Sequence, residues 1–291
     1  MSVSLRRLRK CVHILVVVEN RKESVPPNVE TMEILRIITI ALLLIQSFST
    51  CICAESIQST TTSTTRPRRK YRPPVKRLFR SHDYISTHEA LDYWAISPYY
   101  IGQQDDRSCS LASVTMIVNA ARVEKALLFS EKLPTQQSVM KRVNSEIWNS
   151  GLAPGGEGVT LDQIKSLIEK SFKTHSIKYI SVEIIHTVDL SEETKQKFRR
   201  ILVENEKSSR NFLIANFNGG KVFSGDDYGH FAPIAAYDAG HRQILVMDPE
   251  RQWYEPYWVS EDALLNAMVT KDKKSDQYRG YVWIKLFGRK K

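Results

Sequence analysis

The apolar positions of the chain follow a helical period in its middle part. Between residues 110 and 128 they predict a buried amphipathic helix with the apolar face Leu111, Val114, Ile117, Val118 and Ala121. Thr160 and Gln163 have the spacing of a capping box, which predicts that a second helix begins there and runs to residue 171. A third, charged helix is predicted over residues 192–207.

Shorter apolar runs, most of them later in the chain, predict β-strands at residues 178–185, 211–217, 230–237, 243–247 and 281–286. Because helices come first and strands mostly follow them, the order predicts an α+β fold with an antiparallel sheet. No internal repeat interrupts this part, and its length fits one domain over residues 81–291.

Two of these strands form a predicted hairpin. A three-residue turn, Asp238-Ala239-Gly240, joins them, and its glycine can supply the left-handed residue that such a turn needs. In this register Tyr237 faces His241, and His230 faces Asp248. Cross-strand neighbours have Cβ atoms about 4.5–5.5 Å apart, so this imidazole and this carboxylate are expected within hydrogen-bonding reach.

The N-terminal part carries a targeting pattern. Residues 32–54 show the order of a secretory signal peptide: a short charged start, an apolar run at 37–45 and small polar residues up to Ala54. The run is shorter than the roughly twenty residues that span a bilayer, although an uncleaved signal anchor in a membrane also fits it. We interpret residues 1–31 as a spurious or disordered extension. The expected location is secreted or extracellular, or periplasmic in a bacterium.

The net charge of +10 is concentrated near the N-terminus. Residues 1–54 contribute +3 and residues 55–80, with eight basic residues and one acidic residue, contribute +7, so residues 81–291 are neutral. This distribution argues against a nucleic-acid partner. Residues 55–80 are rich in Thr, Pro and Arg and poor in apolar residues, which predicts a disordered basic linker. The linker is a solvated tether or a contact for an anionic surface.

The cysteine count makes one thiol stand out. The chain has four cysteines, and after signal cleavage only Cys109 remains. It then has no internal disulfide partner, and a single thiolate excludes a Cys-rich metal site. Such a cysteine is either a buried small apolar residue or a reactive nucleophile. Cys109 precedes the predicted helix at residue 110, and a helix N-terminus with a nearby imidazole favours a thiolate.

Three further residues complete a candidate catalytic site. The predicted His230/Asp248 pair supplies a base and an orienting carboxylate for Cys109, the combination that acyl transfer requires. On its own such a pair is more often a structural hydrogen bond. Gln103 lies six residues before Cys109 and is placed to donate its side-chain amide to the oxyanion of a tetrahedral intermediate.

The combined spacing resembles the phytochelatin synthase family. The matching features are Gln103 six residues before Cys109, "CSLAS", "GHFAPI", an Asp eighteen residues after the His, "GVTLDQI" and "DPERQWYEPYWV". The resemblance covers most of residues 93–268 and implies a papain-like cysteine protease fold, with a helical part that carries the Cys and an antiparallel sheet that carries His and Asp. Three features depart from the family pattern: Ser110 replaces its usual Gly, no Cys-rich C-terminal region follows, and this chain is expected to be exported whereas plant-type members are cytosolic.

The resemblance also implies roles for single residues. Cys109 corresponds to the nucleophile, His230 to the base, Asp248 to the orienting residue and Gln103 to the oxyanion donor. The substrate-binding positions correspond to Arg251, Tyr254, Gly229 and Phe231. Arg251 suits a carboxylate because its guanidinium binds in a bidentate manner.

The implied reaction is acyl transfer on glutathione. Glycine leaves, and the γ-Glu-Cys acyl-enzyme passes its acyl group to water or to a second glutathione, which yields a phytochelatin. We expect hydrolysis to dominate because the C-terminal region is absent. No tightly bound cofactor and no metal ligands are expected, and a heavy-metal ion would enter as a metal-glutathione substrate complex. A homodimer is left open. The alternatives are a secreted papain-like peptidase or amidase that acts on another peptide, and a catalytically silent surface-binding module.

Overall fold

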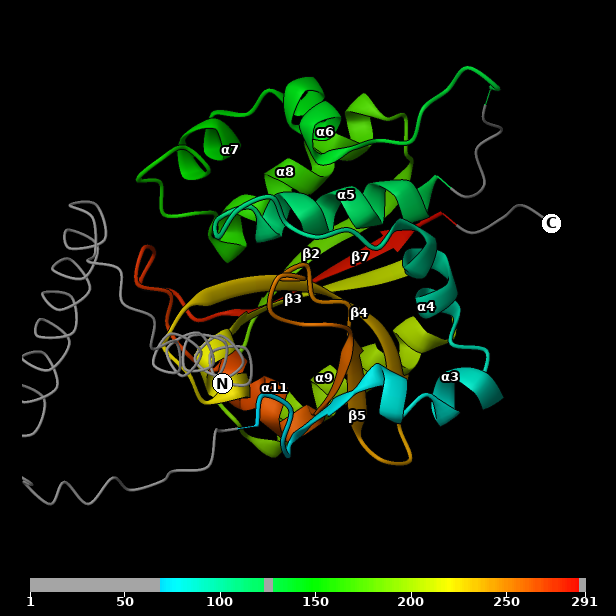
Figure 1. Cartoon of the computed structure of the whole chain (residues 1–291), viewed down its shortest axis with the longest axis vertical. Helices are drawn as coiled ribbons and strands as arrows, with labels where there is room; N and C mark the ends of the chain where they lie inside the picture. The colour runs from blue at the N-terminus through cyan, green and yellow to red at the C-terminus, as the bar shows by residue number, and fades with distance from the viewer. Residues whose placement is uncertain (1–68, 123–127, 288–291) are drawn as a thin grey trace, which may run out of the picture. The chain divides into compact units, whose positions relative to one another are not determined.

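A seven-stranded antiparallel sheet forms the centre of the protein (Figure 1). The computed structural model describes residues 69–122 and 128–287. Within them the strand order is β1-β6-β5-β4-β3-β7-β2. The strands are β1 (Val75–Arg77), β2 (Tyr179–His186), β3 (Asn211–Asn218), β4 (Gly229–Asp238), β5 (Gln243–Val246), β6 (Tyr257–Ser260) and β7 (Gly280–Leu286). This confirms the predicted α+β class and all five predicted strands.

Helices cover both faces of the sheet. In Figure 1 helices α5 to α8 gather on one side, and α9 and α11 lie on the other. The α-helices are α3 (Asp83–Thr87), α4 (Leu91–Ile96), α5 (Cys109–Ala121), α6 (Gln136–Val143), α7 (Glu146–Gly151), α8 (Leu161–Thr174), α9 (Glu192–Glu206), α10 (Gly219–Phe223) and α11 (Glu261–Met268). Two 3₁₀ turns, η1 (Leu78–Arg80) and η2 (Ser97–Tyr99), connect the first elements. The predicted capping box of Thr160 and Gln163 is present at the start of α8.

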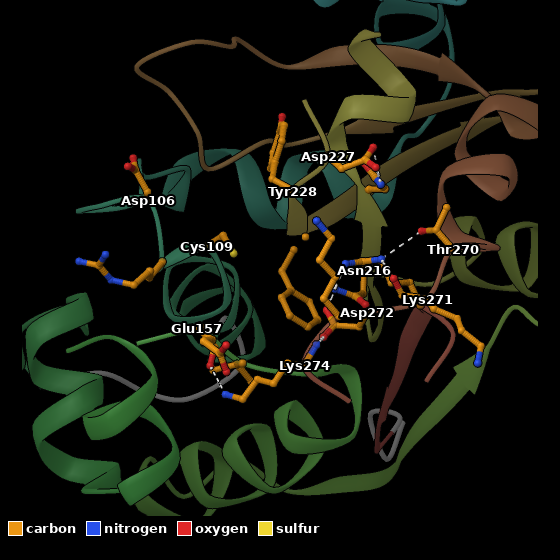
Figure 2. Close-up of a pocket in the computed structure, with 18 of the residues that line it drawn as sticks. Asp106, Cys109, Glu157, Asn216, Asp227, Tyr228, Thr270, Lys271, Asp272 and Lys274 are labelled. Atoms are coloured by element: carbon orange, nitrogen blue, oxygen red, sulfur yellow. Dashed lines mark hydrogen bonds and ion pairs between the residues drawn. The ribbon is translucent and has the colours of Figure 1, made fainter. Parts of the chain in front are cut away.

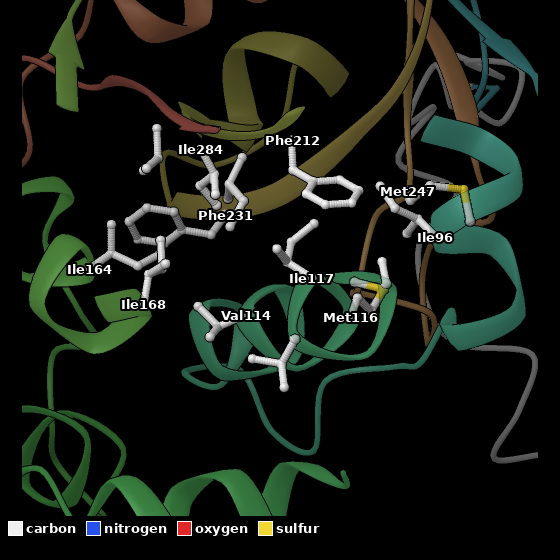
Figure 3. Close-up of a cluster of buried hydrophobic side chains, with 14 of the residues drawn as sticks. Ile96, Val114, Met116, Ile117, Ile164, Ile168, Phe212, Phe231, Met247 and Ile284 are labelled. Atoms are coloured by element: carbon white, nitrogen blue, oxygen red, sulfur yellow. The ribbon is translucent and has the colours of Figure 1, made fainter. Parts of the chain in front are cut away.

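The two-sided cover explains why the central strands are apolar at nearly every position. On β3, Phe212 and Ile214 point into the core below α5 and α8, whereas Leu213 and Phe217 point into a second core with α9 and α11. Successive side chains of a strand alternate between the faces, so a sheet that is buried on both faces needs both sets to be apolar. Figure 3 shows the first core, where Val114, Met116 and Ile117 of α5 pack near side chains of the sheet, Phe212, Phe231 and Ile284.

Helix α5 is buried on all sides. Twelve of its thirteen residues, Cys109 to Ala120, are buried. Helices α4, α6 and α8 and strand β4 all contact it. The helix ends at Ala121 rather than at the predicted residue 128. A helix packed in this way gives its first residue a fixed position, which matters because that residue is Cys109.

The predicted linker is wrong over its last part. Residues 75–77 form β1, which pairs with β6, and Val75 is only 3% exposed. Lys70 Nζ donates to the Trp253 carbonyl at 2.6 Å, and the Glu255 N–H donates to the Tyr71 hydroxyl at 2.8 Å. The composition of this segment does not predict that it is ordered, because its order comes from backbone pairing and from one buried valine. The folded body therefore starts before residue 81. The predicted extension, signal peptide and rest of the linker, residues 1–68, lie outside the described residues.

The predicted hairpin register is also wrong. Tyr237 pairs with Ile244 and Asp238 with Gln243, three positions away from the predicted partners. The Asp238 carboxylate accepts a hydrogen bond from the His241 N–H at 3.1 Å, and the left-handed residue of the turn is Arg242, with φ of +51°, rather than Gly240. The turn is thus one residue longer than predicted, at 239–242, because the Asp238 side chain stabilises it. An irregularity between residues 234 and 236 shifts the register again.

Helix α4 carries a buried carboxylate. Asp92 is 1% exposed, and Asn205 Nδ2 on α9 donates to Asp92 Oδ2. Asp92 Oδ1 and Asn205 Oδ1 are buried and have no partner among the described residues. Burial and the neighbouring Glu206 raise the pKa of Asp92 well above its usual range. Both influences favour the neutral form of Asp92 in the folded protein.

We expect Asp92→Asn to stabilise the protein at alkaline pH. The raised pKa means that the wild type loses stability as pH rises from the unfolded-state value of Asp92 through its folded-state value. Asparagine cannot ionise, and the free energy of unfolding should rise by about 1–3 kcal/mol at pH 8 and change little at acid pH. Urea unfolding at both pH values measures this. A variant that is less stable than the wild type at pH 8 would contradict the neutral Asp92.

Candidate active site

Cys109 is the first residue of α5, and a short loop fixes its position. The Ser108 hydroxyl accepts hydrogen bonds from the N–H groups of Gln104 and Asp105, at 2.9 and 3.0 Å, and donates to the Asp105 carbonyl at 3.0 Å. These bonds close the turn immediately before the helix. The thiol is free, and the residue is 8% exposed. Cys109 therefore lies where the sequence predicts it, at the positive end of a buried helix.

The structure brings Cys109, His230 and Asp248 together. His230 on β4 is 3% exposed, and Asp248, two residues after β5, is fully buried. His230 Nε2 lies 2.7 Å from Asp248 Oδ1. Cys109 influences the charge of the same imidazole, so its thiol lies close to the ring. The three groups therefore have the arrangement of a nucleophile, a proton-transferring imidazole and an orienting carboxylate, although His230 and Asp248 are not the ladder partners that the sequence predicts.

The surroundings of His230 favour its charged form. Burial opposes the charge and lowers the pKa of the imidazole, but the negative charge of Asp248 and its hydrogen bond outweigh burial, with a smaller contribution from Cys109. Together they raise the pKa of His230 from 6.5 to about 10. The imidazole is therefore protonated at neutral pH, which allows it to stabilise a thiolate beside it and to donate a proton to a leaving group.

Several donors hold the Asp248 carboxylate. Oδ1 accepts a second hydrogen bond from the Glu250 N–H at 2.8 Å, and Oδ2 accepts one from the Tyr257 hydroxyl at 2.9 Å. The Asp248 carbonyl accepts a hydrogen bond from the Tyr100 hydroxyl at 2.7 Å. Burial and the Asp248 charge raise the pKa of Tyr257 well above its usual value, so this hydroxyl stays a donor. The sequence does not reveal Tyr257 as a partner because it lies on β6, a strand that was not predicted.

A cavity of about 320 Å³ opens beside the thiol (Figure 2). Cys109, the first residue of α5, borders the cavity. The loop with Glu157 and Gly158 forms one wall, and strands β3 and β4 contribute Asn216 and Phe231. The segment between α11 and β7 forms a further wall, with Thr270, Lys271, Asp272, Lys273, Lys274 and Arg279. Lys274 Nζ donates to the Gly158 carbonyl at 3.0 Å and joins two of these walls.

Charged and amide groups line the inner part of this cavity. Arg279 is 5% exposed, and its Nη2 lies 3.2 Å from Asp272 Oδ2. Its Nη1 donates to the Lys271 carbonyl at 2.5 Å. Four buried polar atoms of lining residues have no partner among the described residues: Arg107 Nε, Arg279 Nε, Asn216 Oδ1 and Asn218 Oδ1. Buried polar atoms are rarely left unpaired, so this wall suits a ligand with both charged and hydrogen-bonding groups.

One protein-family model matches most of the part of the chain that the structure describes. The family model described as phytochelatin synthase matches residues 75–281. The chain belongs to the phytochelatin synthase family. The match includes β1, which supports a folded body that starts before residue 81, and it includes the cysteine, the histidine and the aspartate of the site.

Curated relatives carry the name glutathione gamma-glutamylcysteinyltransferase. The protein of that name from Schizosaccharomyces pombe is 25% identical over 194 residues, which are 66% of this chain and 42% of the relative. Glutathione gamma-glutamylcysteinyltransferase 1 of Arabidopsis thaliana is 24% identical over 199 residues, 66% of this chain and 36% of the relative. The protein with the same name and number from Triticum aestivum is 23% identical over 216 residues. The chain matches about two fifths of the length of these relatives.

In this phytochelatin synthase family member, Gln103 joins two loops. Its N–H donates to the Pro249 carbonyl at 2.7 Å, and its Nε2 donates to the Asp105 carbonyl at 3.0 Å and to the Glu250 carboxylate. Gln103 is therefore next to both the loop before Cys109 and the loop after Asp248. Both hydrogens of its amide are engaged, so in this arrangement it does not offer a donor to an oxyanion.

The four predicted substrate-binding residues separate into two pairs. Gly229 and Phe231, which flank His230, line the cavity. Arg251 and Tyr254 are not among the lining residues that the structure describes. The Arg251 guanidinium stacks on Tyr100, with 4.6 Å between Cζ and the ring centroid, and the Tyr254 ring stacks on Phe223 at 4.0 Å. The chain turns sharply after Asp248, and this turn directs both side chains to other contacts.

Asp272 and Arg279 are the charged pair of the site that sequence reasoning missed. They lie in a polar segment after α11, which resembles an ordinary surface loop in composition. One signal was available, because Arg279 immediately precedes Gly280. A Cβ at Gly280 would lie 2.0 Å from the Ile185 carbonyl oxygen, so only glycine fits there. Arg279 therefore immediately precedes a position where close strand packing requires glycine.

Within residues 69–122 and 128–287 no three His, Cys, Asp or Glu side chains are grouped so that they could hold a metal ion. No helix in the same part is both long and apolar enough to cross a bilayer.

Proposed function

We propose that this chain is a papain-like cysteine enzyme that transfers the γ-Glu-Cys acyl group of glutathione. The observation that carries the proposal is the buried series Cys109, His230 and Asp248 at one end of a charged cavity, in a chain of the phytochelatin synthase family. A papain-like arrangement is supported by the packing of α5, which carries the cysteine, against β4, which carries the histidine.

The first half of the reaction forms an acyl-enzyme. The Cys109 thiolate attacks the carbonyl carbon between the Cys and Gly residues of glutathione, and an S–C bond forms. The Cys109 N–H at the start of α5 stabilises the oxyanion, and Gln103 is the second donor once its amide is released. His230 gives its proton to the glycine nitrogen as the C–N bond breaks. Glycine leaves, and γ-Glu-Cys remains as a thioester on Cys109.

The second half depends on the acceptor. Water yields free γ-Glu-Cys, and the amine of a second glutathione yields a phytochelatin. In both cases the acceptor passes a proton to His230, and the thiolate is restored. A heavy-metal ion would arrive bound to the thiols of its glutathione substrates.

The charged wall of the cavity fits a γ-glutamyl group. That group carries an α-carboxylate and an α-ammonium far from the scissile bond. The Arg279 guanidinium is suited to the carboxylate, and the Asp272 carboxylate and the amide oxygens of Asn216 and Asn218 are suited to the ammonium. A peptide with an ordinary α-linked glutamate places its charges elsewhere and cannot use both partners.

The test compares glutathione with its isomer α-Glu-Cys-Gly. Protein reduced beforehand is mixed with each peptide, intact-protein mass spectrometry looks for an adduct of γ-Glu-Cys minus water, and chromatography measures glycine, γ-Glu-Cys and (γ-Glu-Cys)₂-Gly. We expect the adduct and glycine release with glutathione, and at least about 100-fold slower release with the isomer, since charged hydrogen bonds are worth about 1.5–3 kcal/mol each. The ratio of γ-Glu-Cys to (γ-Glu-Cys)₂-Gly measures how much of the acyl group passes to water and how much to a second glutathione.

Arg279→Met separates this proposal from a general peptidase. The variant keeps an unbranched apolar stem and removes the charged guanidinium, so KM for glutathione should rise and the preference over the isomer should shrink. Lys273→Met, on the same wall, is the matched control for charge. Equal turnover of both peptides by the wild type would instead support a peptidase or amidase, and a folded, reduced protein without adduct or glycine release would refute the proposal.

A further inference from the structure

Glu250 controls the orientation of the Gln103 amide in the structure. Gln103 Nε2 has two hydrogens, and it donates them to the Glu250 carboxylate and to the Asp105 carbonyl at 3.0 Å. The other end of the amide gains nothing from this orientation, since Gln103 Oε1 is buried and has no partner among the described residues. The Gln103 amide keeps Nε2 towards Glu250 although this leaves Oε1 unpaired. The hydrogen bond to the Glu250 carboxylate therefore determines the orientation of the amide.

This contact competes with catalysis. An oxyanion donor needs a free N–H when the tetrahedral intermediate forms. A hydrogen bond to a carboxylate is about twice as strong as one to a neutral acceptor, so of the two acceptors the ionised Glu250 is the one that retains the amide. The Gln103 amide is therefore withheld from the reaction as long as Glu250 carries its charge.

Glu250 is tied to the catalytic carboxylate and surrounded by titrating groups. Its N–H donates to Asp248 Oδ1 at 2.8 Å. Burial is the main influence on its own carboxylate and raises its pKa, the charges of Asp248 and Asp106 raise it further, and His230 opposes them. Two neutral tyrosines, Tyr228 and Tyr254, also face it. Glu250 thus takes up a proton closer to neutral pH than an ordinary glutamate.

We propose that Glu250 is a positioning residue that withholds the Gln103 amide while it is ionised and releases it to the oxyanion when it is protonated or replaced. The inference rests on the proposed function, because it takes Gln103 as an oxyanion donor. It follows that the wild-type rate constant for acyl transfer decreases as pH rises through the pKa of Glu250. The decrease should be confined to kcat, because the oxyanion exists only after attack and not in the bound substrate.

The experiment measures kcat and KM for glycine release from glutathione between pH 5 and pH 9. We expect Glu250→Ala and Glu250→Gln to raise kcat at pH 8 about tenfold, with KM unchanged, and to match the wild type at the acid end. One oxyanion donor is worth about 10²–10³-fold, so a partial release gives an effect of this size. Glu255→Gln is the matched control, since Glu255 lies in the same loop but pairs with Arg77 at 2.7 Å. It should leave the pH profile as it is.

A double-mutant cycle distinguishes control of Gln103 from a structural role. In a Gln103→Ala background, Glu250→Ala should no longer raise kcat, because the amide that it releases is gone. The inference is overturned if Glu250→Ala lowers kcat at every pH while the protein stays folded by circular dichroism, or if it raises kcat equally without Gln103. Absence of any glycine release by the wild type would overturn the proposed function and this inference with it, whereas wild-type activity with unchanged Glu250 variants overturns the inference alone.

Discussion

Cys109→Ala should reduce glycine release from glutathione by at least about 10⁴-fold, the typical loss when a catalytic triad loses one member. The reason is chemical, because alanine cannot form the thioester through which the reaction is proposed to pass. The variant should also show no mass adduct with glutathione. Steady-state glycine assays and intact-protein mass spectrometry measure the two effects. A variant that retains a tenth of the wild-type rate would show that Cys109 is not the nucleophile.

Folding is a separate matter for this variant. Cys109 is buried, but the change removes a single sulfur atom at the edge of a cavity, so the thermal midpoint should move little. The His230→Ala variant supplies a further control. Because the thiolate and the imidazole act as a unit, combining both changes should cost no more than Cys109→Ala alone. Additive losses in the double variant would argue that the two residues work independently.

Asp248→Ala should cost about 10³–10⁴-fold in kcat/KM, again from the behaviour of triads that lose their orienting carboxylate. Asp248 holds the His230 ring through Oδ1 and is itself held by Tyr257 and Glu250. Alanine leaves these buried donors unpaired, so loss of activity and loss of folding must be told apart. Asp248→Asn does this, since it keeps the shape of the side chain, removes its charge and leaves one accepting oxygen for these donors.

The pH dependence of stability and of kcat/KM should report the charge of His230. The wild-type pKa of His230 is raised to about 10, so the contribution of the His230/Asp248 pair to stability is complete below pH 6.5 and is lost as pH rises towards 10. The alkaline limb of kcat/KM should fall in the same window, because the proton for the leaving glycine is lost there. In Asp248→Asn that limb should move to lower pH. An unchanged limb would show that Asp248 does not set the charge of His230.

The candidate site shows where local reasoning succeeds and where it fails. The positions of Cys109 at a helix start and of His230 on an apolar strand follow from short-range signals, and both are correct. The pairing of His230 with Asp248 was derived from a hairpin register that is three positions wrong. The two side chains meet nevertheless, since an irregularity in the ladder and the chain beyond β5 bring Asp248 back to the ring.

Other parts of the site depend on contacts between distant segments. Asp272 and Arg279 reach the cavity because β7 inserts between β3 and β2, a pairing that no local pattern announces. Strand β1 was assigned to a linker because its composition is that of a disordered segment, yet backbone bonds to β6 order it. The contact between Gln103 and Glu250 joins residues 147 positions apart.

By itself the sequence determined the fold class, five of the seven strands that the structure describes, the three longest helices described, and the cysteine, histidine and aspartate of the site. These depend on hydrophobic period, capping residues and motif spacing, which act over a few residues or are preserved as a pattern along the chain. The tertiary structure decided the strand register, the ordering of β1, the charged wall of the cavity and the engagement of Gln103 by Glu250. Such features depend on side-chain hydrogen bonds and close packing between segments far apart in the chain, and only the folded arrangement brings those segments together.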